Sequence, residues 1–156
     1  MRPMPTTFFR AFLLLIGFAA FFFLLWEPHL EGRNRDSTVF DVYFRDPFLI
    51  FAYMGSIPFF ISLYFGYKVL GYMGKNRIFT QTEFNDLRAI RYCGYALTGF
   101  VLVGEIMISM SESDDRAGGV FLGALIGLGS ATMVAFATML ERIWRKANAH
   151  KTEATI

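Results

Sequence analysis

The sequence predicts an all-α fold, a four-helix transmembrane bundle with both termini in the cytoplasm. Four long stretches are almost empty of charge, and a bilayer core about 30 Å thick needs roughly 20 apolar residues to be crossed as a helix. The composition agrees, because 54% of the residues are apolar and 18% are charged, against roughly 25% charge in soluble domains. Lys and Arg are shared unevenly between the two sides of the membrane, which sets the orientation.

Charged residues bound the helices within a single membrane domain of residues 1–156, at about residues 8–26, 47–72, 81–111 and 117–145. Arg10 lies one turn inside the first helix, where its long stem reaches back to the headgroups. An outer loop spans residues 27–46. Pro47 suits the first position of the second helix, and Pro58 should kink it. Thr80 and Glu83 have capping-box spacing, so the third helix should begin near residue 81.

Orientation follows from the basic residues. An even number of helices places both termini and the loop between the second and third helices on one side, which carries eleven of the fifteen Lys and Arg residues. The positive-inside rule makes that side cytoplasmic. The inner-interface residues that we expect to fix topology and contact anionic headgroups, with a protein partner as the alternative, are Lys75, Arg77, Arg88, Arg91, Arg142, Arg145 and Lys146.

The last helix contains a stripe of small residues at four-residue intervals, made of Gly119, Gly123, Gly127, Ala131 and Ala135. Helices in lipid associate where small residues let their backbones approach closely. The stripe therefore predicts tight packing, either internally against the first or third helix or between two copies in a homodimer. We favour internal packing, because a four-helix chain must satisfy its own interfaces first.

Glu105 is the one ionisable residue well inside an uncharged stretch. Inserting a carboxylate near the membrane centre costs roughly 2.5 to 3.5 kcal/mol, so such a residue faces the bundle interior, pairs or is protonated. Arg45 or Arg116 could reach it. We expect a buried carboxylate held by a hydrogen bond or a salt bridge, and the alternative is a proton or cation site in a small carrier.

Other chemistry-bearing patterns are missing from the sequence. Cys93 is the single cysteine, and the predicted topology places His29 and His150 on opposite sides of the membrane. There is no glycine-rich phosphate loop, Ser/His/Asp set or nucleic-acid motif. We therefore expect no enzyme activity, cofactor, metal or direct nucleic-acid binding, and lipid is the expected partner.

A resemblance to a known family lies within residues 57–93. It is carried by Ile57-Pro58-Phe59-Phe60, by Leu63-Tyr64-Phe65-Gly66-Tyr67-Lys68-Val69-Leu70, by Gly74-Lys75-Asn76-Arg77-Ile78-Phe79, and by Leu87-Arg88-Ala89-Ile90-Arg91-Tyr92-Cys93. These stretches resemble the bacterial membrane family named domain of unknown function 2975. The resemblance implies a four-helix protein of the bacterial inner membrane, no assigned reaction, and a small helix-turn-helix regulator as a partner.

Two functions fit the sequence. The first is a non-enzymatic regulatory or envelope-associated membrane component that acts through its cytoplasmic basic face. The alternative is a small proton-coupled carrier centred on Glu105.

Overall fold

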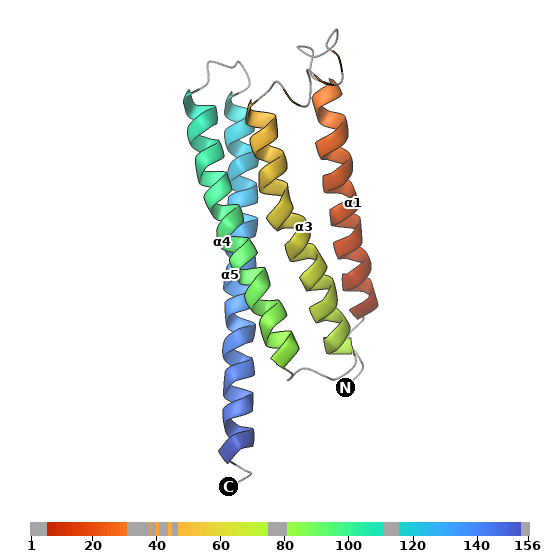
Figure 1. The fold of residues 1–156 in the computed structure, drawn as a ribbon, viewed down its shortest axis with the longest axis vertical. Helices are drawn as coiled ribbons and strands as arrows, with labels where there is room; N and C mark the ends of the chain where they lie inside the picture. Colours follow the sequence, from red (N-terminus) through yellow and green to blue (C-terminus); the bar gives the residue numbers. More distant parts are fainter. Residues whose placement is uncertain are drawn as a thin grey trace.

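The computed structural model describes residues 6–30, 38, 40, 44, 47–74, 81–110 and 116–153. It contains four long helices, α1 (Thr6–Leu30), α3 (Pro47–Gly74), α4 (Gln81–Met110) and α5 (Arg116–Glu153). Consecutive helices run in opposite directions, so the start of α1 and the end of α5 lie at the same end of the molecule (Figure 1). The fold is all-α, as predicted, and all four helices are long and apolar enough to cross a membrane.

Two helices extend further than the charge pattern indicated. The first helix continues past Trp26 to Leu30, and the last continues past Arg145 to Glu153. The predicted bounds were drawn where charges begin, but a helix does not stop where lipid stops, because its hydrogen bonds are internal. The outer loop therefore begins later than residue 27, and most of it, like Thr80, lies outside the described residues.

A proline near the end of α1 explains one contact between helices. Pro28 has no N–H, so the carbonyl of Leu24 lacks its usual partner four residues later. The hydroxyl of Tyr53, on α3, donates a hydrogen bond of 2.9 Å to this carbonyl. An unsatisfied carbonyl at membrane depth is costly, so Tyr53 both completes α1 and fastens it to α3.

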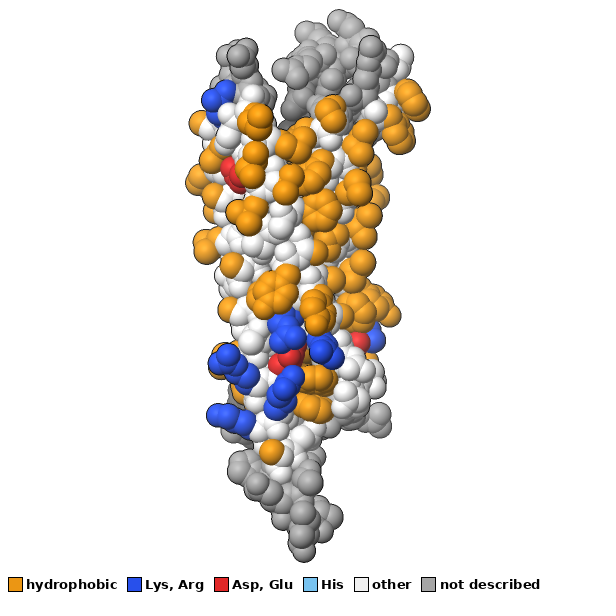
Figure 2. Space-filling view, turned by 60° about the vertical axis from the view of Figure 1, so that its left-hand side comes forward, with side chains coloured by type: hydrophobic (Ala, Val, Ile, Leu, Met, Phe, Trp, Pro, Cys, Tyr) orange, Lys and Arg blue, Asp and Glu red, His pale blue; other side chains and the backbone are white. Residues whose placement is uncertain are grey.

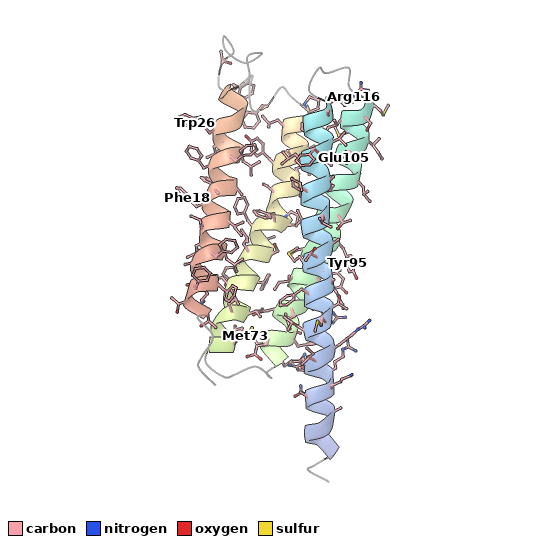
Figure 3. The ribbon with its side chains drawn as sticks, turned by 180° about the vertical axis from the view of Figure 1, so that it is seen from behind. Phe18, Trp26, Met73, Tyr95, Glu105 and Arg116 are labelled. Atoms are coloured by element: carbon pink, nitrogen blue, oxygen red, sulfur yellow. The ribbon has the colours of Figure 1, made fainter. Side chains whose placement is uncertain are left out.

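The helices form a row in chain order, in which α1 packs against α3, α3 against α4, and α4 against α5. The α4–α5 pair has the most extensive contact and the α1–α3 pair the least. Figures 1 and 3 both show α3 standing between α1 and α5. In the described part of the chain, α1 therefore lies at one edge of the row and does not close a ring against α5.

Much of the surface between the two ends is apolar. Phe18 of α1 is 70% exposed and Leu128 of α5 is 67% exposed, and Figure 3 shows Phe18 directed away from the neighbouring helices. A soluble domain does not leave so many large apolar side chains in water. Lipid is therefore the solvent for the middle of all four helices.

The buried core lies toward one end, where three helices meet. Val69 of α3, Leu87 and Ile90 of α4, and Ala137 of α5 are buried together. The same end carries every described Lys and Arg side chain except Arg116, and Figure 2 shows these blue side chains gathered there. We call it the basic end, defined by Arg10, Lys68, Arg88, Arg91, Arg142, Arg145 and Lys146.

Candidate functional site

The glycines of the predicted stripe face α4. A Cβ atom on Gly119 would lie 3.2 Å from Ile108, and one on Gly127 would lie 3.3 Å from Val101. Close approach of this kind is what small residues allow at helix interfaces in lipid. We call Gly119, Gly123 and Gly127 the glycine seam. These glycines pack within the chain, against α4, the third of the four helices.

Ala131 and Ala135 do not continue this seam, because both are exposed. The reason is geometric: four residues turn an α-helix by about 400°, so each step of the stripe rotates about 40° away from the partner helix. The interface instead passes through Ser130, Ala137 and Glu141, which are all buried.

Nearer the basic end, the glycine that lets the two helices approach closely belongs to α4, not to α5. A Cβ atom on Gly94 would overlap the side chain of Val134 and would lie 3.5 Å from the carbonyl oxygen of Ser130. The backbones of α4 and α5 therefore approach closely at Gly94. A sequence search limited to one helix could not single out this glycine, because Gly94, Gly99 and Gly104 are five residues apart, a spacing that does not keep to one helix face. Its contact, Val134, lies 40 residues away.

Glu105 lies against Gly123 of the glycine seam. The carboxylate occupies the space of the missing side chain, since a Cβ atom on Gly123 would overlap Glu105 Oε1. This oxygen is buried and has no hydrogen-bond partner among the described residues. Figure 3 shows Glu105 beside α5, in the half of the molecule nearer to Arg116. The expected hydrogen bond or salt bridge to Arg116 is not formed in the described structure, and Arg45 lies outside the described residues.

A pair of hydroxyl groups joins the same two helices nearer the basic end. Thr98 Oγ1 of α4 and Ser130 Oγ of α5 lie 3.0 Å apart. Each hydroxyl is also 2.9 Å from a carbonyl oxygen of its own helix, that of Gly94 for Thr98 and that of Gly127 for Ser130. Hydroxyl contacts of this type add stability between helices where no water competes.

An ion pair completes the interface at the basic end. Arg91 Nη1 of α4 donates to Glu141 Oε2 of α5 at 2.9 Å. Glu141 is 2% exposed, while its Oε1 and the Nε of Arg91 are buried without a hydrogen-bond partner in the described part of the chain. Arg91 was expected to meet lipid headgroups, and the structure instead turns it toward a buried carboxylate. The buried Glu141 carboxylate is tolerated because the Arg91 guanidinium, whose side chain is 20% exposed, neutralises it.

Basic residues also join the other helix pairs at this end. Lys68 of α3 pairs with the buried Asp86 of α4 at 3.0 Å. Arg10 of α1 donates from Nε to the carbonyl of Tyr67 at 3.3 Å, and its guanidinium carbon lies 4.0 Å from the centroid of the Tyr67 ring. Arg10 therefore contacts α3 instead of reaching freely to headgroups.

The remaining predicted basic residues are arranged around the outside of this end. Arg88, Arg142, Arg145 and Lys146 are exposed, and Arg145 also lies 5.4 Å from the ring of Phe84. That ring stacks on Trp144 with centroids 4.5 Å apart. Lys75 and Arg77 lie outside the described residues. The exposed positive charges suit contact with anionic headgroups or with an acidic partner.

Sequence reasoning missed the acidic partners of these interfaces. Glu141 directly precedes Arg142, and Asp86 lies two residues before Arg88, so the sequence alone is consistent with solvated polar positions for both. A spacing signal was present: Ser130 and Glu141 are eleven residues apart, and Arg91, Thr98 and Glu105 are seven apart. Residues seven or eleven positions apart lie on the same face of a helix.

Comparisons with known proteins agree with the predicted resemblance. A relative from Bacillus subtilis (strain 168), named "Uncharacterized membrane protein YoaS", is 29% identical over 157 residues, which cover 98% of this chain and 97% of that protein. No solved structure matches the chain. The family model described as "Protein of unknown function (DUF2975)" matches residues 35–156, well beyond the stretch 57–93 that suggested it. Because this match covers more than half of a chain with four membrane-spanning candidates, the protein belongs to the DUF2975 family of bacterial membrane proteins.

Proposed function

We propose that the protein is a non-enzymatic regulatory or envelope-associated component of the bacterial cytoplasmic membrane, with both termini in the cytoplasm. The observation that supports this proposal most is the basic end. Exposed cations surround it, and α5 continues beyond the other helices there (Figure 1). By the positive-inside rule, this end faces the cytoplasm.

Reporter fusions test the orientation. Alkaline phosphatase, which is active outside the cytoplasm, should be inactive when fused after Ile156 and active when fused after Arg35. Green fluorescent protein at the same two sites should give the opposite pattern. Phosphatase activity at the C-terminal fusion would overturn the orientation.

The partner that we propose for the basic end is a small helix-turn-helix regulator, by analogy with the family resemblance. The exposed residues Arg142, Arg145 and Lys146 would hold it at the membrane through an acidic surface. Replacing these three residues with Glu should release the regulator from membranes in a sedimentation assay. The matched control is Arg116→Glu, at the other end of the same helix. Equal retention by both variants would exclude this surface as the docking site.

A second candidate function is a small proton-coupled carrier that uses Glu105. It is supported by the unpartnered, buried Oε1 of this residue, because a membrane carboxyl without a structural partner is available to bind and release a proton. Replacing Glu105 with Gln should abolish proton-coupled transport and leave the protein folded. Loss of folding in this variant would instead assign Glu105 to a structural role.

A further inference from the structure

We propose that one side of the α4–α5 pair binds an anionic phospholipid, with the phosphate between Arg88 of α4 and Arg145 of α5. This proposal goes beyond the proposed function, since its ligand is a lipid and neither a regulator nor a proton. We call this side the lipid face, and it consists of Arg88, Tyr92, Tyr95 and Gly99 of α4 and Ala131, Ala135 and Arg145 of α5.

Helix geometry places these residues on one side of the pair. The two helices run in opposite directions (Figure 1), and they meet at the ion pair and at the hydroxyl pair described above. Each residue turns an α-helix by about 100°, and in two antiparallel right-handed helices this turn carries the next residue of both toward the same side. Tyr92 and Arg142 follow the ion pair on that side. Gly99 and Ala131 follow the hydroxyl pair on the same side.

The positive charge of the lipid face comes from both helices at one level. Arg88 lies three residues before Arg91, and Arg145 lies four residues after Glu141. These steps turn the two helices by about 60° and 40° toward the same side, and they move about 4.5 and 6 Å toward the basic end. Both arginines are exposed, and Arg145 lies 5.4 Å from the ring of Phe84, one turn before Arg88. The two guanidinium groups therefore flank the same part of the surface.

The acidic residues near this level do not neutralise the two arginines. Glu141 is held by its ion pair with α4, and Asp86 pairs with Lys68 of α3. Glu83 is buried and lies about 140° around α4 from Arg88. A phosphate is the matching ligand, because arginine forms strong, paired hydrogen bonds to phosphate oxygens.

Tyrosines lie directly above the arginines on the lipid face. Tyr92 and Tyr95 are 56% and 55% exposed, and the guanidinium carbon of Arg88 lies 6.0 Å from the centroid of the Tyr92 ring. Amphipathic rings of this kind mark the level of the headgroups. The arginines therefore lie at the depth at which a phospholipid carries its phosphate.

Small residues continue the lipid face toward the middle of the membrane. Gly99, Ala131 and Ala135 are exposed, and nothing lies within 4 Å of a Cβ position on Gly99. At 1.5 Å per residue, the three lie about 9–15 Å further into the membrane than the ion pair, within half of a core about 30 Å thick. Ala131 and Ala135, which do not contact α4 as the glycine seam does, thus leave room for an acyl chain.

The combination of charge and apolar surface favours a lipid over a protein. Figure 2 shows basic side chains on one face of the basic end, with apolar side chains above them. A soluble acidic protein would meet the charges alone, whereas a phospholipid meets both parts of the face. Arg145 is shared with the surface proposed for a regulator, but Arg142 and Lys146 turn about 60° and 100° further away from α4.

Native mass spectrometry of the full chain tests the proposal. The protein in detergent is titrated with phosphatidylglycerol or with phosphatidylethanolamine of the same acyl chains, and the bound lipid is counted. Phosphatidylglycerol should bind more tightly, and equal binding of the two lipids would overturn the proposal. Arg88→Gln and Arg145→Gln should each weaken phosphatidylglycerol binding about fivefold, and together about 30-fold, as expected for positive side chains near an anionic lipid.

The matched control for the charges is Lys146→Gln, which removes one positive charge next to Arg145 but on a more distant side of α5. This variant should bind phosphatidylglycerol like the wild type. The melting temperature in detergent shows that each variant is folded. A loss in Lys146→Gln as large as that in Arg145→Gln would show a diffuse effect of charge and would overturn the site.

A bulky side chain at Gly99 tests the acyl part of the site. Gly99→Leu places its side chain in open space, so it should leave the melting temperature unchanged or higher and weaken phosphatidylglycerol binding severalfold. Gly129→Leu is the matched control, because its Cβ position is also open and lies about 160° around α5 from Ala131. Wild-type binding by Gly99→Leu would overturn the proposal.

Two further outcomes identify a different ligand. A large excess of inorganic phosphate should not displace the lipid, and displacement would show a site for a free anion, which overturns the lipid face. Wild-type lipid binding by the variant that carries both Arg88→Gln and Arg145→Gln, together with loss of an acidic protein from membranes, would assign the face to a protein and overturn the proposal.

Discussion

Replacing Gly123 with Ala places a methyl group where the carboxylate of Glu105 lies. The new Cβ would overlap Oε1 and would lie 2.9 Å from Cδ, so the Glu105 side chain must move or the helices must separate. Overpacking of this kind costs about 1–3 kcal/mol. The substitution also gains about 1 kcal/mol from the helix propensity of Ala over Gly, which hides part of the cost in a single variant.

A double-mutant cycle removes this ambiguity. In a Glu105→Ala background the carboxylate is absent, so Gly123→Ala should cost nothing and keep only the propensity gain. The propensity term is the same in both backgrounds and cancels, which leaves a coupling free energy of about 1–3 kcal/mol between the two sites. Gly129→Ala is the matched control, since nothing lies within 4 Å of its Cβ position.

The assay is the free energy of unfolding in mixed micelles titrated with sodium dodecyl sulfate and followed by circular dichroism. Independent sites add to within about 0.5 kcal/mol. A coupling free energy below that value would show that the Glu105 carboxylate does not occupy the space beside Gly123, and the described packing of α4 on α5 would then be wrong.

Two further substitutions test other contacts between helices. Tyr53→Phe leaves the carbonyl of Leu24 without its 2.9 Å hydrogen bond and should lower the free energy of unfolding by about 0.6–1.7 kcal/mol. The control is Tyr64→Phe, at a residue that is 61% exposed. Equal stability of the two variants would contradict the role given to Tyr53. Glu141→Gln removes the charge that pairs with Arg91, whose side chain is 20% exposed, and should cost about 1.5–3 kcal/mol, the range for a hydrogen bond to a charged group. The double variant Arg91→Met, Glu141→Met should regain most of that loss in the same unfolding titration, and a double variant as unstable as Glu141→Gln would contradict a paired interaction.

The sequence was sufficient for the architecture because the lipid environment imposes one strong rule. Backbone groups in lipid must be satisfied within a helix, so long uncharged stretches such as residues 117–140 define spans directly. The start of α4 at Gln81 was predictable for a similar reason, since Thr80 and Glu83 have the spacing of a helix start. The far ends of α1 and α5 were not predictable, because nothing at Trp26 or Arg145 requires a helix to stop.

The candidate site was predictable only in part, because pairing between helices depends on crossing geometry. Gly123 and Glu105 were each recognised from one helix, but the fact that one occupies the space of the other depends on how α4 crosses α5. The strict four-residue period that drew attention to Ala131 and Ala135 also led away from the true contact, since an α-helix has about 3.6 residues per turn. Glu141 and Asp86 were overlooked because their burial arises from Arg91 and Lys68 on neighbouring helices.

Cysteine cross-linking in native membranes examines the α4–α5 interface most directly. With Cys93 replaced by Ser, cysteines are placed at residues 101 and 127, since a Cβ on Gly127 would lie 3.3 Å from the Val101 side chain. Oxidation should give a rapid disulfide within one chain, and the pair Leu102 and Gly129, which lie on exposed faces, should remain reduced. A cross-linked dimer, or no disulfide at all, would contradict the packing of the glycine seam within one chain.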